Sequence, residues 1–176
     1  MWQGGGGNLK RSLRDLLAVL VVGLALGGSS ICYAAEQPKL DGTRPLTDPL
    51  VCLARTIYFE ARGQSTKELT AVGYVVVNRA KHSQFPDDIC AVIREGGETP
   101  PCQFSWWCDG RSDVAVNRRE YNRAVKVARG ILEGTLMDPT KGANMFHNLS
   151  AAPRWAQKAE RRGRIGDQVF YYLEDR

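Results

Sequence analysis

Apolar residues recur at helical spacing in four segments of the chain, and each segment is bounded by residues that begin or end helices. Asp48 can cap a helix, and Pro49 is tolerated at a first helical position. Gly63 stops the segment that follows, while Ser65 and Glu68 form a capping-box pattern. The sequence therefore predicts helices over residues 49–62, 65–79, 87–94 and 118–132.

The chain between and after these helices has no helical period. Residues 98–113 are rich in Pro, Gly, Cys and Trp, which predicts a disulfide-pinned loop or a short hairpin. Short apolar pieces at 143–147 and 168–173 predict a small β-hairpin or sheet. The predicted class is thus α+β but mainly α, because most of the apolar pattern is helical.

The first residues are organised like an export signal. Lys10, Arg11 and Arg14 precede an apolar run from Leu16 to Leu26, which is shorter than the about 20 residues of a membrane span. An uncleaved N-terminal anchor is the alternative. We expect a signal peptide over residues 1–34, a flexible leader over 35–47 and one domain over 48–176. The protein would then be exported to the periplasm or cell envelope, with no membrane span after cleavage.

Four cysteines remain after such a cleavage, and an even number in an exported chain indicates two disulfides. Three pairings are possible. We favour Cys52 with Cys90, which would join two predicted helices, and Cys102 with Cys108, which would close a short loop. A metal site would use closely spaced cysteine pairs, and the sequence has none.

Charge changes this picture little. The chain has 24 Lys and Arg against 19 Asp and Glu, a formal net charge of +5. The excess would favour approach to anionic polymers, although an ordinary solvated surface accounts for it equally well. No long basic block with interleaved aromatic residues occurs, so nucleic acid is not an expected partner.

Glu60 carries the clearest chemical signal. At 3.6 residues per turn, Leu53, Ile57 and Glu60 fall on one helix face, so the carboxylate lies at the edge of an apolar stripe. Burial there would raise the pKa of the carboxyl group, as a glycosidase general acid requires near neutral pH. The alternative is a structural acid paired with a nearby arginine, namely Arg55, Arg62 or Arg79.

Several strings follow one another in a specific order around and after Glu60. They are IYFEARGQ at 57–64, AVGYVVVNR at 71–79, QFSWWCDG at 103–110, ANMFH at 143–147, PRW at 153–155 and FY at 170–171. In this combination they resemble the SleB-type cell-wall hydrolases, a family named for a spore-cortex-lytic enzyme. The resemblance extends over about residues 50–172.

The resemblance implies a fold and a chemistry. The fold is a single domain similar to lysozyme and lytic transglycosylases, with a small β-hairpin or sheet. The chemistry is cleavage of peptidoglycan glycan strands between N-acetylmuramic acid and N-acetylglucosamine, by a muramidase or a lytic transglycosylase. The glutamate that matches Glu60 would act as acid and base.

The number of usable acids favours the lytic transglycosylase. Most glycosidases need two carboxylates that flank the sugar bond. A lytic transglycosylase needs one, because the same group protonates the glycosidic oxygen and then accepts a proton as the muramoyl 6-hydroxyl closes a 1,6-anhydro ring. Asp109 is the best second carboxylate, with a turn residue before Gly110 as its structural alternative.

Other polar and aromatic side chains are candidates for contact with sugars. For Asn78 and Ser105 a structural hydrogen bond is an equal alternative. Trp106, Trp107 and Trp155 could stack on sugar rings, and we expect at most one of the adjacent pair to face substrate. The predicted substrate-binding residues are Gln64, Tyr74, Asn78, Gln103, Ser105, Trp106 and His147.

Two other functions remain open. One is an N-acetylmuramoyl-L-alanine amidase, but a zinc enzyme needs about three protein ligands and His82 and His147 are the only histidines. The other is a non-catalytic peptidoglycan-binding module, in which an unneeded carboxylate on an apolar face would be costly. We expect no cofactor and no metal, with peptidoglycan as the partner of a monomeric protein.

Overall fold

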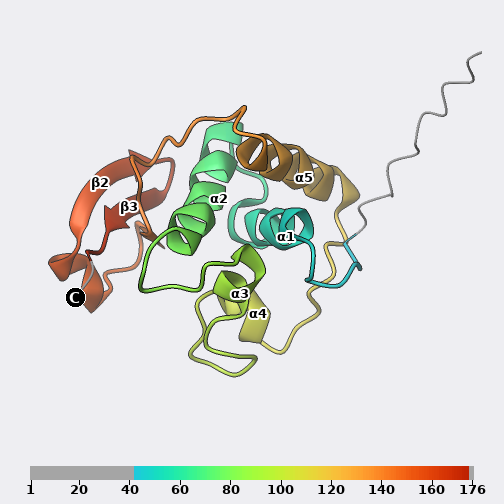
Figure 1. The fold of residues 1–176 in the computed structure, drawn as a ribbon, viewed down its shortest axis with the longest axis horizontal. Coiled ribbons are helices and arrows are strands. Elements are labelled where there is room, and N and C mark those ends of the chain that lie inside the picture. Colours follow the sequence, from blue (N-terminus) through green and yellow to red (C-terminus); the bar gives the residue numbers. More distant parts are fainter. Residues whose placement is uncertain (1–41, 175–176) are drawn as a thin grey trace, which may run out of the picture. The chain divides into compact units, whose positions relative to one another are not determined.

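A computed structural model describes residues 42–174 of the chain. The predicted signal peptide and residues 35–41 of the predicted leader lie outside the described residues. Figure 1 shows the order of the elements. They are α1 (Pro49–Ala61), α2 (Thr66–Ala80), α3 (Ile89–Arg94), α4 (Ser105–Cys108), α5 (Arg118–Leu132), β1 (Met145–Asn148), a 3-10 helix (Arg154–Lys158), β2 (Glu160–Ile165) and β3 (Gln168–Tyr172).

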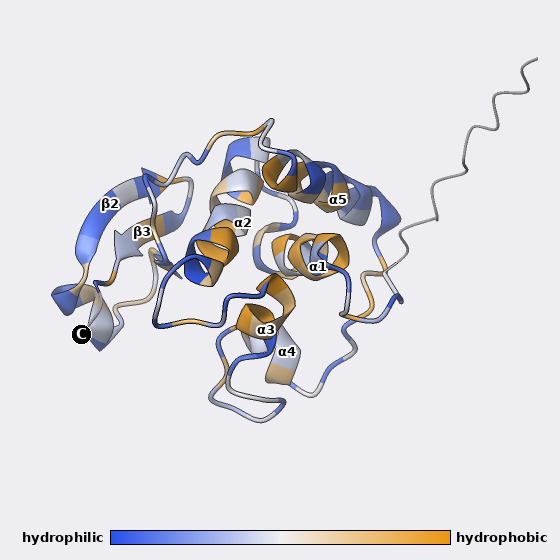
Figure 2. Cartoon of the chain, viewed as in Figure 1, coloured by the Kyte–Doolittle hydropathy of each residue, from blue (hydrophilic) through white to orange (hydrophobic). Residues whose placement is uncertain are grey.

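Helix α1 is the centre of the helical part. It begins as predicted, with the Asp48 carboxylate accepting a hydrogen bond from the Leu50 amide at 2.9 Å and Pro49 in the first turn. Its side chains are buried on almost every side, and Figures 1 and 2 show this apolar helix between α2, α3 and α5. A helix that is apolar all round is stable only when other elements cover it.

Helices α2 and α5 pack against α1 and against each other. The predicted capping box at the start of α2 is present, because Ser65 and Glu68 each accept the other's backbone N–H. Helix α5 spans the predicted residues and buries one stripe, which includes Tyr121, Ala124 and Ala128. Its other face is polar (Figure 2), so α5 is an amphipathic cover for the core.

The strands form a three-stranded antiparallel sheet in the order β1-β3-β2. A second apolar cluster, formed by Ala71, Val75, Ala143 and Phe170, joins this sheet to α2. Strand β2 was not predicted, because its sequence ERRGRI has no alternation of apolar and polar residues. It becomes a strand through its pairing with β3.

The loop before α5 differs from its prediction in one respect. A helix of one turn, α4, lies inside the segment expected to be a loop or hairpin. One turn is too short to produce a periodic pattern, and it is instead fixed by the Cys102–Cys108 disulfide and by burial of Trp106. The favoured disulfide pairing is confirmed, since Cys52 is joined to Cys90 as well.

Residues 42–47, which the sequence placed in the leader, pack against the domain. The side chain of Leu46 is 8% exposed, and its carbonyl accepts a hydrogen bond from Arg94 at 2.6 Å. Arg55 donates to the carbonyls of Gly42 and Arg44 at 2.9 and 2.6 Å. These polar side chains, which lie far apart in sequence, attach a stretch that has no secondary-structure pattern of its own.

Candidate active site

Glu60 lies in the last turn of α1 and lines an open cleft. Leu53 and Ile57 on the same helix face are fully buried, whereas Glu60 is half-buried, as the predicted edge position requires. The cleft, called the Glu60 cleft below, has a volume of about 440 Å³. Its lining comes from the end of α1, from α4 and from the loop before α5: Tyr58, Phe59, Glu60, Arg62, Ser105, Trp106, Asp109, Arg111, Ser112, Val114 and Val116.

Burial controls the protonation of Glu60. Loss of hydration raises the pKa of its carboxyl group from 4.5 to about 7, and the positive charge of Arg79 opposes part of this rise. At neutral pH a large fraction of the Glu60 side chains therefore carries a proton. A group in this state can donate a proton and afterwards accept one, which is the requirement for general acid–base catalysis.

The arginines named as structural partners of Glu60 are occupied elsewhere. Arg55 donates to Gly42 and Arg44, and Arg62 donates to the Tyr58 hydroxyl at 3.3 Å. Within residues 42–174, the Glu60 carboxylate makes neither a hydrogen bond nor an ion pair. The Glu60 carboxyl group is thus available to a ligand and is not a structural ion-pair partner.

Arg79 is a fixed cation behind the site. Its side chain is 3% exposed, its Nε donates to the Asn144 carbonyl at 2.7 Å, and its guanidinium lies 5.0 Å from the centre of the Phe104 ring. Burial lowers the pKa of Arg79 to about 10, with Glu95 and Glu60 acting in the opposite direction. Arg79 remains charged at neutral pH and limits how far burial can raise the pKa of Glu60.

Aromatic rings form one wall of the Glu60 cleft. The ring of Phe59 stacks on Trp106 with their centres 5.1 Å apart, and Trp107 packs against Trp106 in an edge-to-face arrangement at 6.1 Å. Of the two adjacent tryptophans, Trp106 lines the cleft and Trp107 does not, although Trp106 is only 5% exposed. Phe59 and Trp106 thus place apolar surface in the same cleft as the Glu60 carboxyl group.

Asp109 lines the same cleft, but its carboxylate already has a local role. Its Oδ1 accepts a hydrogen bond from the Arg111 amide at 2.9 Å, and Gly110 between them has a φ of 70°. This is the turn geometry named as the alternative for Asp109. Glu60 is therefore the acid in the cleft whose protonation burial controls.

The structure brings Ser105 and Trp106 to Glu60, and it places Tyr74 and Asn78 elsewhere. The Tyr74 hydroxyl donates to the Leu136 carbonyl. The Asn78 amide donates to Asp138 Oδ2 at 3.0 Å and to the Ala143 carbonyl at 2.9 Å. Both side chains project from α2 toward the segment that joins α5 to β1, so they hold that segment instead of lining the Glu60 cleft.

The remaining predicted contacts also lie outside the lining of the Glu60 cleft. The backbone of Gln64 accepts from Arg123 at 2.9 Å, and the amide of Gln103 donates to the Glu95 carbonyl at 3.2 Å. His147 lies on β1, stacked on Tyr171 with ring centres 5.3 Å apart and edge-to-face with Trp155. Their assignment as substrate-binding residues stays a prediction, because these contacts neither include nor exclude a sugar chain.

Several residues of the cleft lining were not predicted. They come from the C-terminal end of α1 and from the loop before α5, and they are Tyr58, Phe59, Arg62, Arg111, Ser112, Val114 and Val116. Tyr58, Phe59 and Arg62 are in the same string as Glu60, and that proximity was an available signal. The loop residues have no periodic pattern, and only the folded loop brings them to the cleft.

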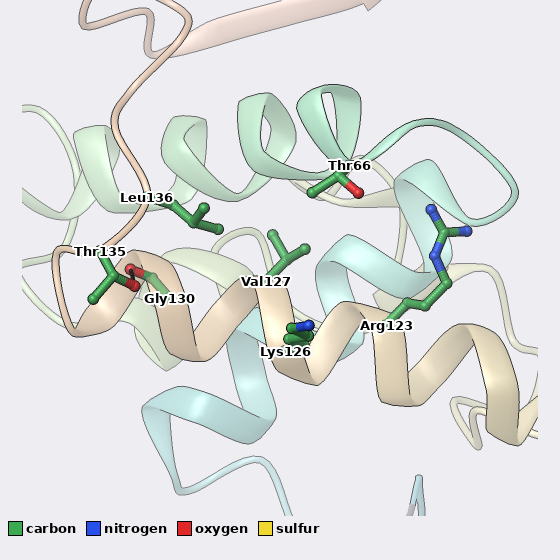
Figure 3. A pocket seen from close by; sticks show the side chains of 7 residues that line it. All are labelled: Thr66, Arg123, Lys126, Val127, Gly130, Thr135 and Leu136. Atoms are coloured by element: carbon green, nitrogen blue, oxygen red, sulfur yellow. Dashed lines mark hydrogen bonds between the residues drawn. The ribbon is translucent and has the colours of Figure 1, made fainter.

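A second hollow lies between the start of α2 and α5 (Figure 3), with a volume of about 340 Å³. Val127 and Leu136 form its apolar part, while Arg123 at its end is bonded to Glu120 and to the Gln64 carbonyl, each at 2.9 Å. None of the predicted site residues lines it. Across residues 42–174, no three His, Cys, Asp or Glu side chains are grouped to hold a metal, and no helix is long and apolar enough to cross a membrane.

The fold and the cleft together define a small, mainly helical domain with one desolvated glutamic acid. The chain belongs to the cell wall hydrolase family, because residues 63–171 match the sequence profile described as Cell Wall Hydrolase. The matched segment begins at Gly63, just after Glu60.

Similar proteins agree with this assignment. The spore cortex-lytic enzymes of Halalkalibacterium halodurans and Bacillus subtilis are 28% and 27% identical over 119 residues. Each match covers 67% of this chain, and this chain spans about a third (33% and 35%) of those relatives. The solved catalytic domain of the germination-specific lytic transglycosylase SleB from Bacillus anthracis has a TM-score of 0.58 at 26% identity, over 70% of this chain and 93% of that domain.

The solved catalytic domain of the Bacillus cereus SleB protein has the same fold. Its TM-score is 0.55 at 22% identity, over 77% of this chain and 98% of that domain. The two SleB domains confirm the predicted fold class, a mainly helical, lysozyme-like domain with a small sheet.

Proposed function

We propose that this protein is a lytic transglycosylase that cleaves peptidoglycan glycan strands between N-acetylmuramic acid and N-acetylglucosamine, with Glu60 as its single acid and base. The observation that carries the proposal is the carboxyl group of Glu60, which lines an open cleft, has no partner within residues 42–174 and has a pKa raised to about 7. The similar SleB protein of Bacillus anthracis is a germination-specific lytic transglycosylase, which supports the same activity here.

The proposed reaction needs one proton carrier. Protonated Glu60 donates its proton to the glycosidic oxygen, and the bond from that oxygen to the muramoyl C1 breaks. The muramoyl 6-hydroxyl then attacks C1 and returns its proton to Glu60, which closes the 1,6-anhydro ring. No water enters the products, so the second carboxylate of a hydrolase, which would activate water or form a covalent intermediate, is not required.

The cleft residues have distinct parts in this proposal. Trp106 and Phe59 keep the proton on Glu60 by excluding water, and Trp106 also offers a ring edge to a sugar. The exposed hydroxyl of Ser105 can bond to a sugar hydroxyl or N-acetyl group. Arg79 keeps the pKa of Glu60 from rising further, so the same carboxyl group can also act as a base.

Products released from purified sacculi test the proposal. A lytic transglycosylase releases muropeptides that end in 1,6-anhydromuramic acid. Mass spectrometry identifies these products because their mass is lower than that of the hydrolysed product by one water molecule. Muropeptides with a reducing muramic acid would identify a muramidase instead. Free stem peptides would identify an amidase, and binding without any product would identify a peptidoglycan-binding module.

We also propose export to the periplasm or cell envelope, where the protein acts as a monomer on peptidoglycan. Two disulfides within a small domain are typical of a chain that folds in an oxidising compartment. Fractionation of cells, with detection of the protein and of its N-terminus, tests this location and whether the chain begins after Ala34.

A further inference from the structure

A small hollow between the sheet and the start of α2 is lined by four cations. Its volume is about 180 Å³, and its charged residues are Lys67 from α2, Lys141 from the loop before β1, and Arg162 and Arg164 from β2. We call it the cationic hollow. None of these residues lines the Glu60 cleft.

The positive charge of the cationic hollow is only partly balanced. Arg162 pairs with Glu160 at 3.0 Å, and Arg164 lies 3.7 Å from Asp167. The side chains of the two acids are 57% and 73% exposed, so both pairs are in contact with water. Lys67 and Lys141 have no ion pair within residues 42–174. In addition, Nε of Arg162 is buried without a hydrogen-bond partner.

The loop that carries Lys141 is fixed before any ligand arrives. Lys141 has a φ of 60°, a left-handed conformation that is uncommon for a residue with a side chain. Asp138 holds the loop by accepting hydrogen bonds from the amides of Thr140 and Gly142 at 2.7 and 2.9 Å, and Asn78 donates to it from α2. The ammonium group of Lys141 is therefore presented from a rigid backbone.

Strand β2 fixes Arg162 in a similar way. The register between β2 and β3 shifts between Arg161 and Gly163, which leaves Arg162 out of the regular pairing. Such a bulge re-aims a side chain. The guanidinium of Arg162 then lies 4.8 Å from the centre of the Tyr172 ring, where stacking limits its freedom.

We infer that the cationic hollow binds carboxylate groups of the peptide stems of peptidoglycan, and this inference rests on the proposed function. Two planar guanidinium groups and two ammonium groups suit an oxyanion. The hollow has less than half the volume of the Glu60 cleft, so it admits a carboxylate with a few carbon atoms but not a run of sugars. Peptide stems carry such carboxylates on the same polymer that the Glu60 cleft would cut.

Charge removal at the two lysines tests the site. Lys67→Gln combined with Lys141→Asn removes two charges, and asparagine tolerates the left-handed backbone at position 141. The matched control, Lys81→Gln combined with Lys126→Gln, removes two charges from exposed lysines outside the cationic hollow. Both variants are made in the Glu60→Gln background, so binding to sacculi by co-sedimentation is measured without cleavage.

We expect the Lys67/Lys141 variant to bind intact sacculi about fivefold more weakly than the control variant, the size expected for two partly exposed ion pairs. On sacculi whose carboxylates have been converted to amides, the two variants should bind equally. Equal binding to intact sacculi, or an equal difference on amidated sacculi, would overturn the inference. The inference would also be overturned if polyphosphate competed for binding more strongly than polyglutamate. The ligand of the hollow would then be a phosphate polymer.

This binding measurement is separate from the proposed reaction. If the wild-type protein releases no product but the Lys67/Lys141 variant still binds more weakly, carboxylate binding by the cationic hollow is supported and the proposed transglycosylase activity is rejected. If the wild-type protein releases anhydro-muropeptides and the variant binds like the control, the proposed reaction is supported and carboxylate binding by the cationic hollow is rejected.

Discussion

The helical part of the molecule and its sheet use polar side chains in opposite ways. In the helical part, Glu60 is half-buried at the edge of an apolar helix, and its loss of hydration raises its pKa to about 7. In the sheet, β2 presents Arg162 and Arg164 to water with only partial pairing. The same chain thus keeps one acid partly protonated near neutral pH in one part and an excess of positive charge in the other.

The difference shows how packing determines what an ionisable group can do. Glu60 extends from a helix that is covered on nearly all sides, so its carboxyl group is half-buried and shares its cleft with Phe59 and Trp106. Strand β2 lies at an edge of the sheet and pairs only with β3, and its side chains are exposed or half-buried. The first environment suits proton transfer, and the second suits the attraction of an anion.

The largest expected effect concerns activity at Glu60. Glu60→Gln retains the shape of the side chain but cannot transfer a proton, so we expect the rate of product release from sacculi to fall by about 10³-fold. The control is Glu133→Gln, which removes an exposed carboxylate at the C-cap of α5 and should leave the rate unchanged. Full activity in the Glu60→Gln protein would show that Glu60 does not transfer the proton. The helical part would then lack the special acid that distinguishes it from the sheet.

The next effect concerns stability, because the two disulfides differ in loop length and in place. Cys52–Cys90 spans 38 residues and joins α1 to α3, so Cys52→Ser with Cys90→Ser should cost about 4 kcal/mol. Cys102–Cys108 spans 6 residues beside the Glu60 cleft, so its removal should cost about 2 kcal/mol. Urea unfolding measures both values.

Activity assays extend the comparison of the two disulfides. Removal of Cys102–Cys108 releases α4, which carries Ser105 and Trp106, so it should lower activity more than removal of Cys52–Cys90 under conditions where both proteins are folded. The reverse order of activities would show that α4 does not need this restraint.

A smaller effect is the pH dependence of stability that Glu60 itself causes. Its pKa is about 7 in the folded protein and near 4.5 when unfolded, so between these values the folded state binds more protons. Stability therefore falls as pH rises from about 4.5 to 7, by roughly 2–3 kcal/mol in total. Urea unfolding of the wild-type and Glu60→Gln proteins at pH 4.5 and 8 isolates this contribution, and an unchanged difference between the two proteins would contradict it.

The same pKa sets a limit on catalysis. Because the acid must hold its proton to begin the reaction, the rate should decline as pH rises through about 7. Arg79→Gln removes a charge that lowers the pKa of Glu60, so it should move this decline to higher pH. Arg79→Lys, which retains the charge, is the matched control, and an identical decline in both variants would show that the charge has no influence.

The smallest effect belongs to the loop beside the sheet. Burial raises the pKa of Asp138, but hydrogen bonds from Thr140, Asn78 and Gly142 outweigh it, and the pKa lies below its ordinary value. Its contribution to stability is therefore present above the unfolded pKa and is lost as pH falls through the folded pKa. Asp138→Asn should cost about 1 kcal/mol near neutral pH and make acid unfolding less steep. A cost that stays constant down to pH 2 would show that the carboxylate charge is not involved.

Local sequence predicted much of the helical part correctly. Asp48, Pro49 and the Ser65–Glu68 capping box located the starts of α1 and α2, and the apolar stripe placed Glu60 at the edge of the core. These features depend on residues within a few turns of each other, so their patterns are readable along the chain. That stripe, together with the resemblance to known hydrolases, predicts Glu60 as the acid.

Contacts between distant residues decided the rest. Strand β2 exists because β3 pairs with it, and Tyr74 and Asn78 bond to the segment after α5 because the fold brings it against α2. The cationic hollow combines residues 67, 141, 162 and 164, which no spacing rule connects.

The sequence by itself determined helices α1, α2, α3 and α5, the disulfide cysteines and the stripe that carries Glu60, because each depends on local periodicity or residue type. Only the tertiary structure decided which side chains surround that acid and which gather at the sheet. The physical reason is that desolvation and charge balance are properties of a surrounding volume, and the residues that fill such a volume come from segments far apart in the chain.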